Sequence, residues 1–205
     1  MSRRQRLVVT VLCLLTAALA VCLDYSCHSR KQQTIPSQQA AAISDYEKYN
    51  DKIFLVLKAV DGDTIDLDVP DGDSPYTRIR LCGVDTPETK HPNTAVMYFG
   101  PEALEFTKKS AQGKIVRVFL DAEKSRDKYK RILAYVQLPD GKFLNEELLS
   151  EGFAYADTRF KHSCYHKYLQ LESVAKRAKK GLWCNVTYDQ LPQWKQKREP
   201  NLLRK

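Results

Sequence analysis

Short runs of apolar residues, separated by turn residues, fill the middle of the chain. In residues 64–69, three apolar side chains alternate with polar ones, which is typical of a strand with one buried face. Asp-Gly and Pro-Asp-Gly sequences follow several of the runs, as expected for turns between strands. By these criteria the sequence predicts five strands, at residues 53–60, 64–69, 76–84, 114–120 and 131–138.

Three other segments carry helix signals. Pro101 suits the first turn of a helix that ends near residue 110. Asn145 can cap a short helix that Gly152 ends. The longest helix is predicted at residues 165–180, where apolar side chains recur at helical spacing.

The order of these elements favours a small barrel. One helix is inserted after the third strand, so strands and helices do not alternate regularly, as they would in a doubly wound parallel sheet. A five-stranded barrel of the OB type fits this order better. The expected fold is therefore α+β and mainly β barrel, with about three helices.

The chain begins with two segments of opposite polarity. Residues 7–23 are apolar except for two threonines and follow three arginines, a pattern typical of a secretory signal. The apolar run has 17 residues, which is near the lower limit for spanning a bilayer. We therefore interpret residues 1–23 as a signal peptide or membrane anchor. Residues 24–50 are polar with few large apolar side chains, and we interpret them as a linker.

Three alternatives are open for this N-terminal segment. Cleavage after Ala20 would give a secreted protein. Retention of residues 7–23 would give a protein anchored in a membrane. Cys22 could carry a lipid anchor, although the valine before it is a poor match to a bacterial lipobox. All three predict an exported protein, either secreted or membrane-associated.

Composition and charge narrow the class of partner. Of the 205 residues, 43% are hydrophobic and 28% are charged, which argues against a disordered chain and against a membrane protein with several spans. The net charge of +8 suits a polyanion such as nucleic acid or an anionic membrane. Several of the basic residues lie in residues 185–205, which we interpret as a basic tail.

Two acidic clusters at strand ends are the main candidates for chemistry. Either cluster alone could be a simple turn. Together, Asp63 and Asp85 could supply two of the oxygen ligands that a hard cation requires. Glu88 follows closely enough to act on a water bound there. Arg80 and Arg131 would add positive charge for a phosphodiester that becomes more negative in its transition state.

Four motifs between residues 53 and 183 stand in a distinctive order and spacing. They are KAVDGDT at 58–64, VDTPETKHP at 84–92, YFGPEA at 98–103 and DKYKR at 127–131. In these motifs the chain resembles the staphylococcal nuclease family, also called micrococcal nuclease or thermonuclease. The resemblance implies an SNase-like OB-fold domain at residues 51–184. It also implies a calcium-dependent endonuclease that cleaves DNA and RNA, prefers single strands and leaves 3′-phosphate ends. We expect the protein to be a monomer.

The same resemblance assigns a metal site and a base. Asp63, Asp85 and the backbone carbonyl of Thr86 would bind calcium. Asp61 would contact these ligands and support them without binding calcium itself. Glu88 would act as the general base or orient the attacking water.

The resemblance also assigns residues to the substrate. Arg80 and Arg131 would bind the scissile phosphate and stabilise the transition state. Lys128 and Tyr129 match positions that contact a neighbouring phosphate.

The chain departs from the family pattern in two places. Lys130 stands where the family has a glycine. Thr158 and Phe160 stand where the family has two tyrosines that pack around the nucleotide, so Phe160 is the candidate for base stacking. A catalytically weak nucleic-acid-binding OB module is therefore the alternative function. Such a module would not need the complete set of two metal-binding acids, base and two arginines.

Overall fold

The computed structural model describes residues 45–89 and 96–203. The predicted signal or anchor at residues 1–23, with Cys22, lies outside these ranges, as does most of the predicted linker at residues 24–50. Within the described ranges, no helix is long and apolar enough to cross a membrane.

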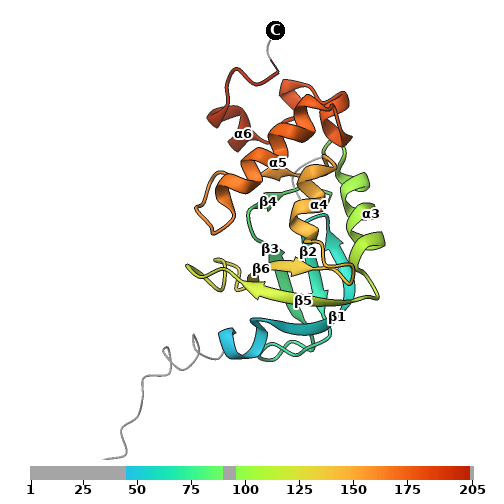
Figure 1. Ribbon diagram of the computed structural model, residues 1–205, viewed down its shortest axis with the longest axis vertical. Coiled ribbons are helices and arrows are strands. Elements are labelled where there is room, and N and C mark those ends of the chain that lie inside the picture. Colours follow the sequence, from blue (N-terminus) through green and yellow to red (C-terminus); the bar gives the residue numbers. More distant parts are fainter. Residues whose placement is uncertain (1–44, 90–95, 204–205) are drawn as a thin grey trace, which may run out of the picture. The chain divides into compact units, whose positions relative to one another are not determined.

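Five strands close into a barrel in the order β1, β2, β3, β6, β5 (Figure 1). The strands are β1 Lys52–Asp61, β2 Thr64–Leu67, β3 Thr77–Leu81, β5 Ile115–Leu120 and β6 Ile132–Gln137. Strands β3 and β6 pair in parallel, and the other neighbours are antiparallel. The predicted five-stranded barrel is confirmed, with small shifts at the strand ends.

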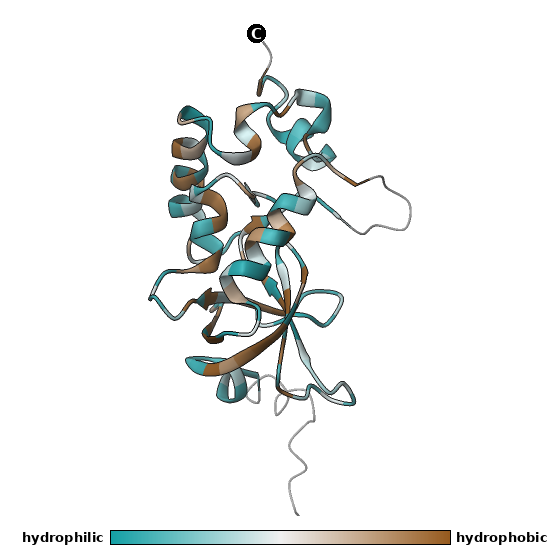
Figure 2. Ribbon diagram, turned by 90° about the vertical axis from the view of Figure 1, so that its right-hand side faces the viewer, coloured by the Kyte–Doolittle hydropathy of each residue, from teal (hydrophilic) through white to brown (hydrophobic). Residues whose placement is uncertain are grey.

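Buried and partly exposed side chains alternate along the strands, and the buried ones form the core of the barrel. Thr77, Ile79 and Leu81 of β3 are buried, whereas Arg78 and Arg80 between them are partly exposed. Buried side chains of the other strands line the same interior, and the strands are largely brown in Figure 2. Both arginines of β3 therefore lie on the outer face of the barrel.

Helices α3, α4 and α5 correspond to the three predicted helices. They span α3 Gly100–Ala111, α4 Leu144–Ser150 and α5 Tyr165–Arg177. The prediction that Asn145 caps α4 is wrong. Asn145 lies within the first turn of the helix, and Phe143 is the residue that precedes it. Its buried side chain accepts a hydrogen bond from the backbone N–H of Val136 and donates one to the carbonyl of Cys82, each at 3.0 Å. Asn145 thus joins α4 to the barrel instead of capping the N-terminus of the helix.

Residues 186–203, which we call the C-terminal segment, do not form the predicted basic tail. They follow the 3₁₀-helix η1 Gly181–Cys184 and contain the 3₁₀-helix η2 Tyr188–Gln190 and the helix α6 Gln193–Arg198. Val186 and Leu191 are buried in a second apolar cluster with Tyr155 and Trp183. The prediction is wrong because it rests on the many charged residues of this segment. Its few apolar side chains pack against the rest of the protein and hold the segment there.

The end of the predicted linker is also part of the fold. Residues 45–49 are helical, and the side chain of Tyr49 is fully buried. The hydroxyl of Tyr49 lies 3.1 Å from the hydroxyl of Thr77 in β3. Asp45 forms an ion pair with Arg126 at 2.6 Å. The predicted linker at residues 24–50 is therefore too long by six residues, because residues 45–50 belong to the fold.

Candidate active site

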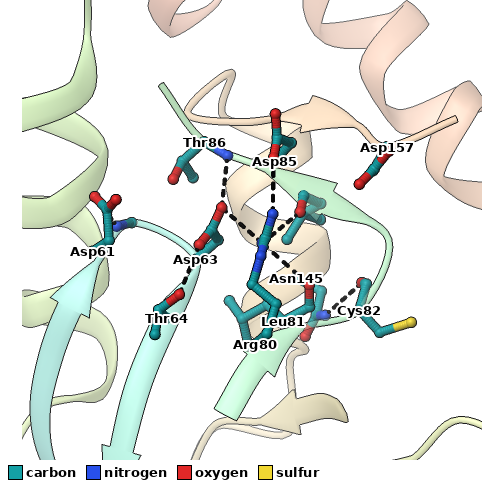
Figure 3. A network of polar contacts seen from close by, with 12 residues as sticks. Asp61, Asp63, Thr64, Arg80, Leu81, Cys82, Asp85, Thr86, Asn145 and Asp157 are labelled. Atoms are coloured by element: carbon teal, nitrogen blue, oxygen red, sulfur yellow. Dashed lines mark hydrogen bonds and ion pairs between the residues drawn. The ribbon is translucent and has the colours of Figure 1, made fainter. Parts of the chain in front are cut away.

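The guanidinium of Arg80 stands at the centre of a polar network at one end of the barrel (Figure 3). Its Nη1 atom lies 2.7 Å from Oδ2 of Asp63, and its Nη2 atom lies 2.8 Å from Oδ1 of Asp85. Nη1 also donates a hydrogen bond to the carbonyl of Val84 at 2.7 Å. The two carboxylates predicted to bind metal therefore converge on one arginine.

Strand pairing explains this convergence. Thr64 in β2 is the register partner of Arg80 in β3, so the β1–β2 turn brings Asp63 beside the guanidinium. Asp85 reaches the same point through the short strand β4 Val84–Asp85, which pairs with β7 Tyr155–Ala156. Burial lowers the pKa of Arg80, but the carboxylates of Asp63 and Asp85 raise it more, so the guanidinium stays charged.

Asp63 is fixed from several directions. Its Oδ1 accepts a hydrogen bond from the hydroxyl of Thr64 at 2.9 Å, and its Oδ2 accepts one from the backbone N–H of Thr86 at 3.1 Å. Gly62 permits this close approach, because a Cβ there would lie 2.6 Å from Oγ1 of Thr86. The same Oγ1 is buried without a hydrogen-bond partner among the described residues. An unsatisfied buried oxygen beside a carboxylate suits a site that takes up a polar ligand.

Asp61 lies beside Glu88. Oδ1 of Asp61 accepts hydrogen bonds from the N–H of Gly62 and from the hydroxyl of Thr89, both at 2.8 Å. Burial, followed by a hydrogen bond with Glu88, raises the pKa of Asp61 to about 6. Two carboxyl groups can share a hydrogen bond only if one is protonated, which explains the direction of this shift. Asp61 therefore contacts the predicted base, whereas sequence reasoning linked it to the metal ligands.

Arg131 belongs to a second group of side chains, away from the carboxylates of Asp63 and Asp85. Its guanidinium is paired with Asp127 at 2.7 Å and lies 5.4 Å from the ring centroid of Tyr129. The ammonium of Lys128 lies 4.9 Å from the same ring. Tyr129 is 67% exposed, so this cationic and aromatic group faces solvent.

The parallel pairing of β3 and β6 relates the two groups. Ile79 is opposite Ile132, so Arg131 continues the register opposite Arg78. Arg78 and Arg80 share the outer face of β3, two residues apart, which is about 7 Å along a strand. The fold therefore aligns Arg80 and Arg131 along one outer face, although each has its own carboxylate partners.

The remaining predicted substrate residue stands apart. Phe160 is 69% exposed, as a base-stacking side chain would need to be. The guanidinium of Arg159 lies 6.0 Å from the centroid of its ring. The guanidinium of Arg159 also contacts Asp85, which connects the Phe160 loop to the Arg80 network.

Sequence reasoning missed two residues that contact Asp85. Nη2 of Arg159 lies 2.8 Å from Oδ1 of Asp85, and the indole Nε1 of Trp194 donates to Oδ2 at 2.8 Å. The guanidinium of Arg159 also lies over the ring of Trp194, 4.8 Å from its centroid. The sequence offers no signal for this contact, because Trp194 is 109 positions from Asp85 in a stretch rich in charged residues.

A cavity of about 810 Å³ opens beside Glu88. One wall is formed by residues 96–98 and another by residues 189–193 and Gln196 of the C-terminal segment. A second hollow of about 330 Å³ is lined by Tyr129, Lys130 and Arg131 together with residues of the β2–β3 region. Predicted catalytic residues thus border both hollows.

A family model described as Staphylococcal nuclease homologue matches residues 78–185, more than half of the chain. The chain belongs to the staphylococcal nuclease family. The matched range includes Arg80, Asp85, Glu88 and Arg131 of the site. The C-terminal segment with Trp194 lies beyond it.

Relatives agree with this family. The chain is 39% identical over 137 residues to the thermonuclease of Staphylococcus hyicus, which covers 66% of this chain and 78% of that protein. It is 48% identical over 103 residues to the thermonuclease of Staphylococcus intermedius, covering 50% and 58%. It is 37% identical over 135 residues to endonuclease YncB of Bacillus subtilis, covering 64% and 61%. The last two alignments span less than two thirds of those relatives.

Proposed function

We propose that this protein is a calcium-dependent endonuclease that hydrolyses phosphodiester bonds of DNA and RNA. The observation that carries the proposal is the convergence of Asp63 and Asp85 on Arg80, in a chain of the staphylococcal nuclease family. The relatives described above are two thermonucleases and an endonuclease, which supports the same reaction class. We further propose a preference for single strands and 3′-phosphate products, in line with the family resemblance.

The donor chemistry around Asp63 and Asp85 fits calcium. The proposed ligands, two carboxylates and the carbonyl of Thr86, are all oxygens, as a hard cation requires. The unsatisfied Oγ1 of Thr86 adds a further oxygen at the same place. Among residues 45–89 and 96–203, no group of three or more acidic, histidine or cysteine side chains could hold a metal ion. A site with two carboxylates and one carbonyl would leave coordination positions for water and substrate. When bound, calcium would supply positive charge to the phosphate.

The side chains divide the remaining work. Glu88 would accept a proton from the attacking water at its carboxylate, and the hydrogen bond with Asp61 would hold that carboxylate in place. Arg80 is held in its charged form by two carboxylates, and its guanidinium would bind the scissile phosphate. Arg131 would bind the same phosphate from the loop before β6. Cleavage of the bond to the 5′ oxygen leaves the phosphate on the 3′ side.

The test is direct hydrolysis by the purified protein. Single-stranded DNA and RNA are incubated with it in calcium and in EGTA, and the chemistry of the product ends is determined. We expect cleavage in calcium only, with 3′-phosphate ends. A folded, calcium-replete protein that binds the strands without cutting them would instead favour the alternative, a nucleic-acid-binding OB module.

We also propose that the enzyme is exported, and that residues 1–23 either are removed or anchor it. The support is the sequence alone: three arginines followed by the apolar run at residues 7–23. Mass spectrometry of the protein recovered from cells and medium would distinguish cleavage after Ala20 from a retained or lipidated N-terminus. Recovery of the intact, unmodified chain from the cytosol would contradict export.

A further inference from the structure

We infer that the C-terminal segment is part of the active site and that Trp194 is a positioning residue for Asp85 and Arg159. This inference rests on the proposed function, because it takes Asp85 as a ligand of the metal. It goes beyond the family match, which ends at residue 185.

A buried lysine anchors the segment. Lys195 of α6 is fully buried, and its Nζ lies 2.9 Å from Glu172 and 2.8 Å from Glu199. Glu172, on α5, is itself buried and accepts a hydrogen bond from the backbone N–H of Ala156 in β7. A buried charge without its partner is strongly destabilising, so this pair fixes α6 against α5 and β7.

The residue before this lysine reaches the site. The indole N–H of Trp194 donates to Oδ2 of Asp85 at 2.8 Å, while Oδ1 of the same carboxylate faces Arg80 and Arg159. An indole N–H can donate a hydrogen bond but cannot accept one, so the carboxylate of Asp85 is the acceptor in this contact. The C-terminal segment therefore supplies a hydrogen bond to the oxygen of Asp85 that does not face the two arginines.

The contact also sets the position of Arg159. Its guanidinium lies over the ring of Trp194 at 4.8 Å and is paired with Asp157 and Asp85, each at 2.8 Å. Stacking on an aromatic ring restricts the plane of a guanidinium and leaves its N–H edges free to pair with anions. The Nε and Nη2 atoms of Arg159 donate to the carboxylates of Asp157 and Asp85, and the side chain is one-third exposed. Arg159 is therefore placed to meet a substrate phosphate as a third arginine.

Partners that orient a metal ligand usually affect metal affinity strongly. Loss of such a hydrogen bond typically weakens binding by about 10- to 100-fold. Trp194 has this relation to Asp85, whereas Trp183, the other tryptophan of the chain, does not: its Nε1 is buried without a partner in the described part of the chain. The two tryptophans therefore form a matched pair for mutation.

The experiment compares Trp194→Phe with Trp183→Phe. Each variant loses one indole N–H, but only the first loses a hydrogen bond to Asp85. Calcium affinity is measured by titration calorimetry without substrate, and thermal unfolding checks that both variants are folded. We expect about 10-fold weaker calcium binding for Trp194→Phe and an unchanged affinity for Trp183→Phe. Equal affinities in the two folded variants would overturn the inference.

A second measurement leaves Trp194 in place. Trp183→Phe retains Trp194 as its only tryptophan, so its fluorescence reports on the Asp85 contact. We expect calcium to change that fluorescence, with a midpoint equal to the calorimetric affinity. A flat titration in a protein that binds calcium would also overturn the inference. If the wild type neither binds calcium nor cleaves nucleic acid, the proposed function fails as well, and that outcome is distinct from the previous two.

Discussion

Arg80 and Arg131 are both proposed to bind the scissile phosphate, but the protein holds them in different ways. Arg80 is paired with Asp63 and Asp85, which come from two other strand ends, and its side chain is 13% exposed. Arg131 is paired with Asp127, four residues away in its own loop, and its side chain is 27% exposed. Placement of Arg80 therefore depends on the whole barrel, whereas placement of Arg131 depends mainly on one loop.

This difference predicts that alanine substitutions at the two arginines have different effects on the free energy of unfolding. Arg80→Ala would leave two largely buried carboxylates without their shared cation, so we expect it to abolish activity and to lower the free energy of unfolding by about 3 kcal/mol. Arg131→Ala should reduce activity by about 10²-fold or more. It should change the free energy of unfolding by less than about 1 kcal/mol, because its ion pair is local and partly exposed.

Denaturant unfolding and single-turnover cleavage measure these two quantities on the same preparations. Arg80→Lys is a useful additional variant, because it keeps the charge and loses the two-pronged geometry. A loss of stability in Arg131→Ala as large as that in Arg80→Ala would break the comparison.

Glu88→Gln should affect chemistry without affecting the fold. The amide cannot accept the proton of the attacking water, so we expect turnover to fall by about 10²- to 10⁴-fold. Glu88 contacts Asp61 in the same end of the barrel as Arg80, and the neutral amide can still hydrogen-bond to it. Activity is followed at saturating calcium, with thermal unfolding as the control. Full turnover in this variant would remove Glu88 from the mechanism.

The end of the barrel that holds Arg80 should also show a pH-dependent stability, because the pKa of Asp61 is shifted there. The pKa of Asp61 is raised from 3.8 to about 6 by burial and by Glu88, so the folded state binds a proton more tightly than the unfolded chain does. The contribution of Asp61 to stability is therefore present at low pH and is lost as the pH rises through about 6.

Asp61→Asn should remove that contribution to the pH dependence. In EGTA, we expect the wild type to lose more stability than this variant between pH 4 and pH 6, the range set by the two pKa values. Chemical unfolding at several pH values measures the difference. Parallel stability curves for the two proteins would contradict the assigned shift.

The smallest effect is expected in the loop of Arg131. Lys130 has a φ of 65°, in the left-handed region that favours glycine, and the family pattern has glycine there. Lys130→Gly should stabilise the protein by about 0.5 kcal/mol, since relief of strain exceeds the added entropy of the unfolded chain. Lys130→Ala is the matched control: it removes the same charge but keeps the Cβ. An equal gain in both variants would point to charge instead of backbone strain.

The barrel and the Arg80 network were predictable from the sequence for a physical reason. Alternation in the strands is a direct consequence of one buried face, and Asp63 and Asp85 stand at strand ends where side chains of different strands meet. The register of β2 and β3 then brings Asp63 to Arg80 without further information. Local patterns were sufficient because the decisive contacts follow from strand pairing.

The roles of Asn145 and of the C-terminal segment could not be predicted, because they depend on contacts between residues that are distant in the sequence. Asn145 has the residue type of a helix cap, and only the packed structure shows its amide joining α4 to β6. Lys195 is one of several basic residues near the chain end, and its burial requires Glu172 on another helix. Composition cannot distinguish such a lysine from a solvated one, so the sequence alone predicts a basic tail for the C-terminal segment.

The buried ion pair of Lys195 has a consequence for the gene. A stop codon after Pro192 would leave every residue of the four family motifs in the product. It would also delete Lys195, the fully buried one of the two lysines paired with Glu172, and the tryptophan that contacts Asp85. Alleles that stop at Pro192 or earlier should therefore be inactive, even though a product that ends at Pro192 would still match the family over residues 78–185.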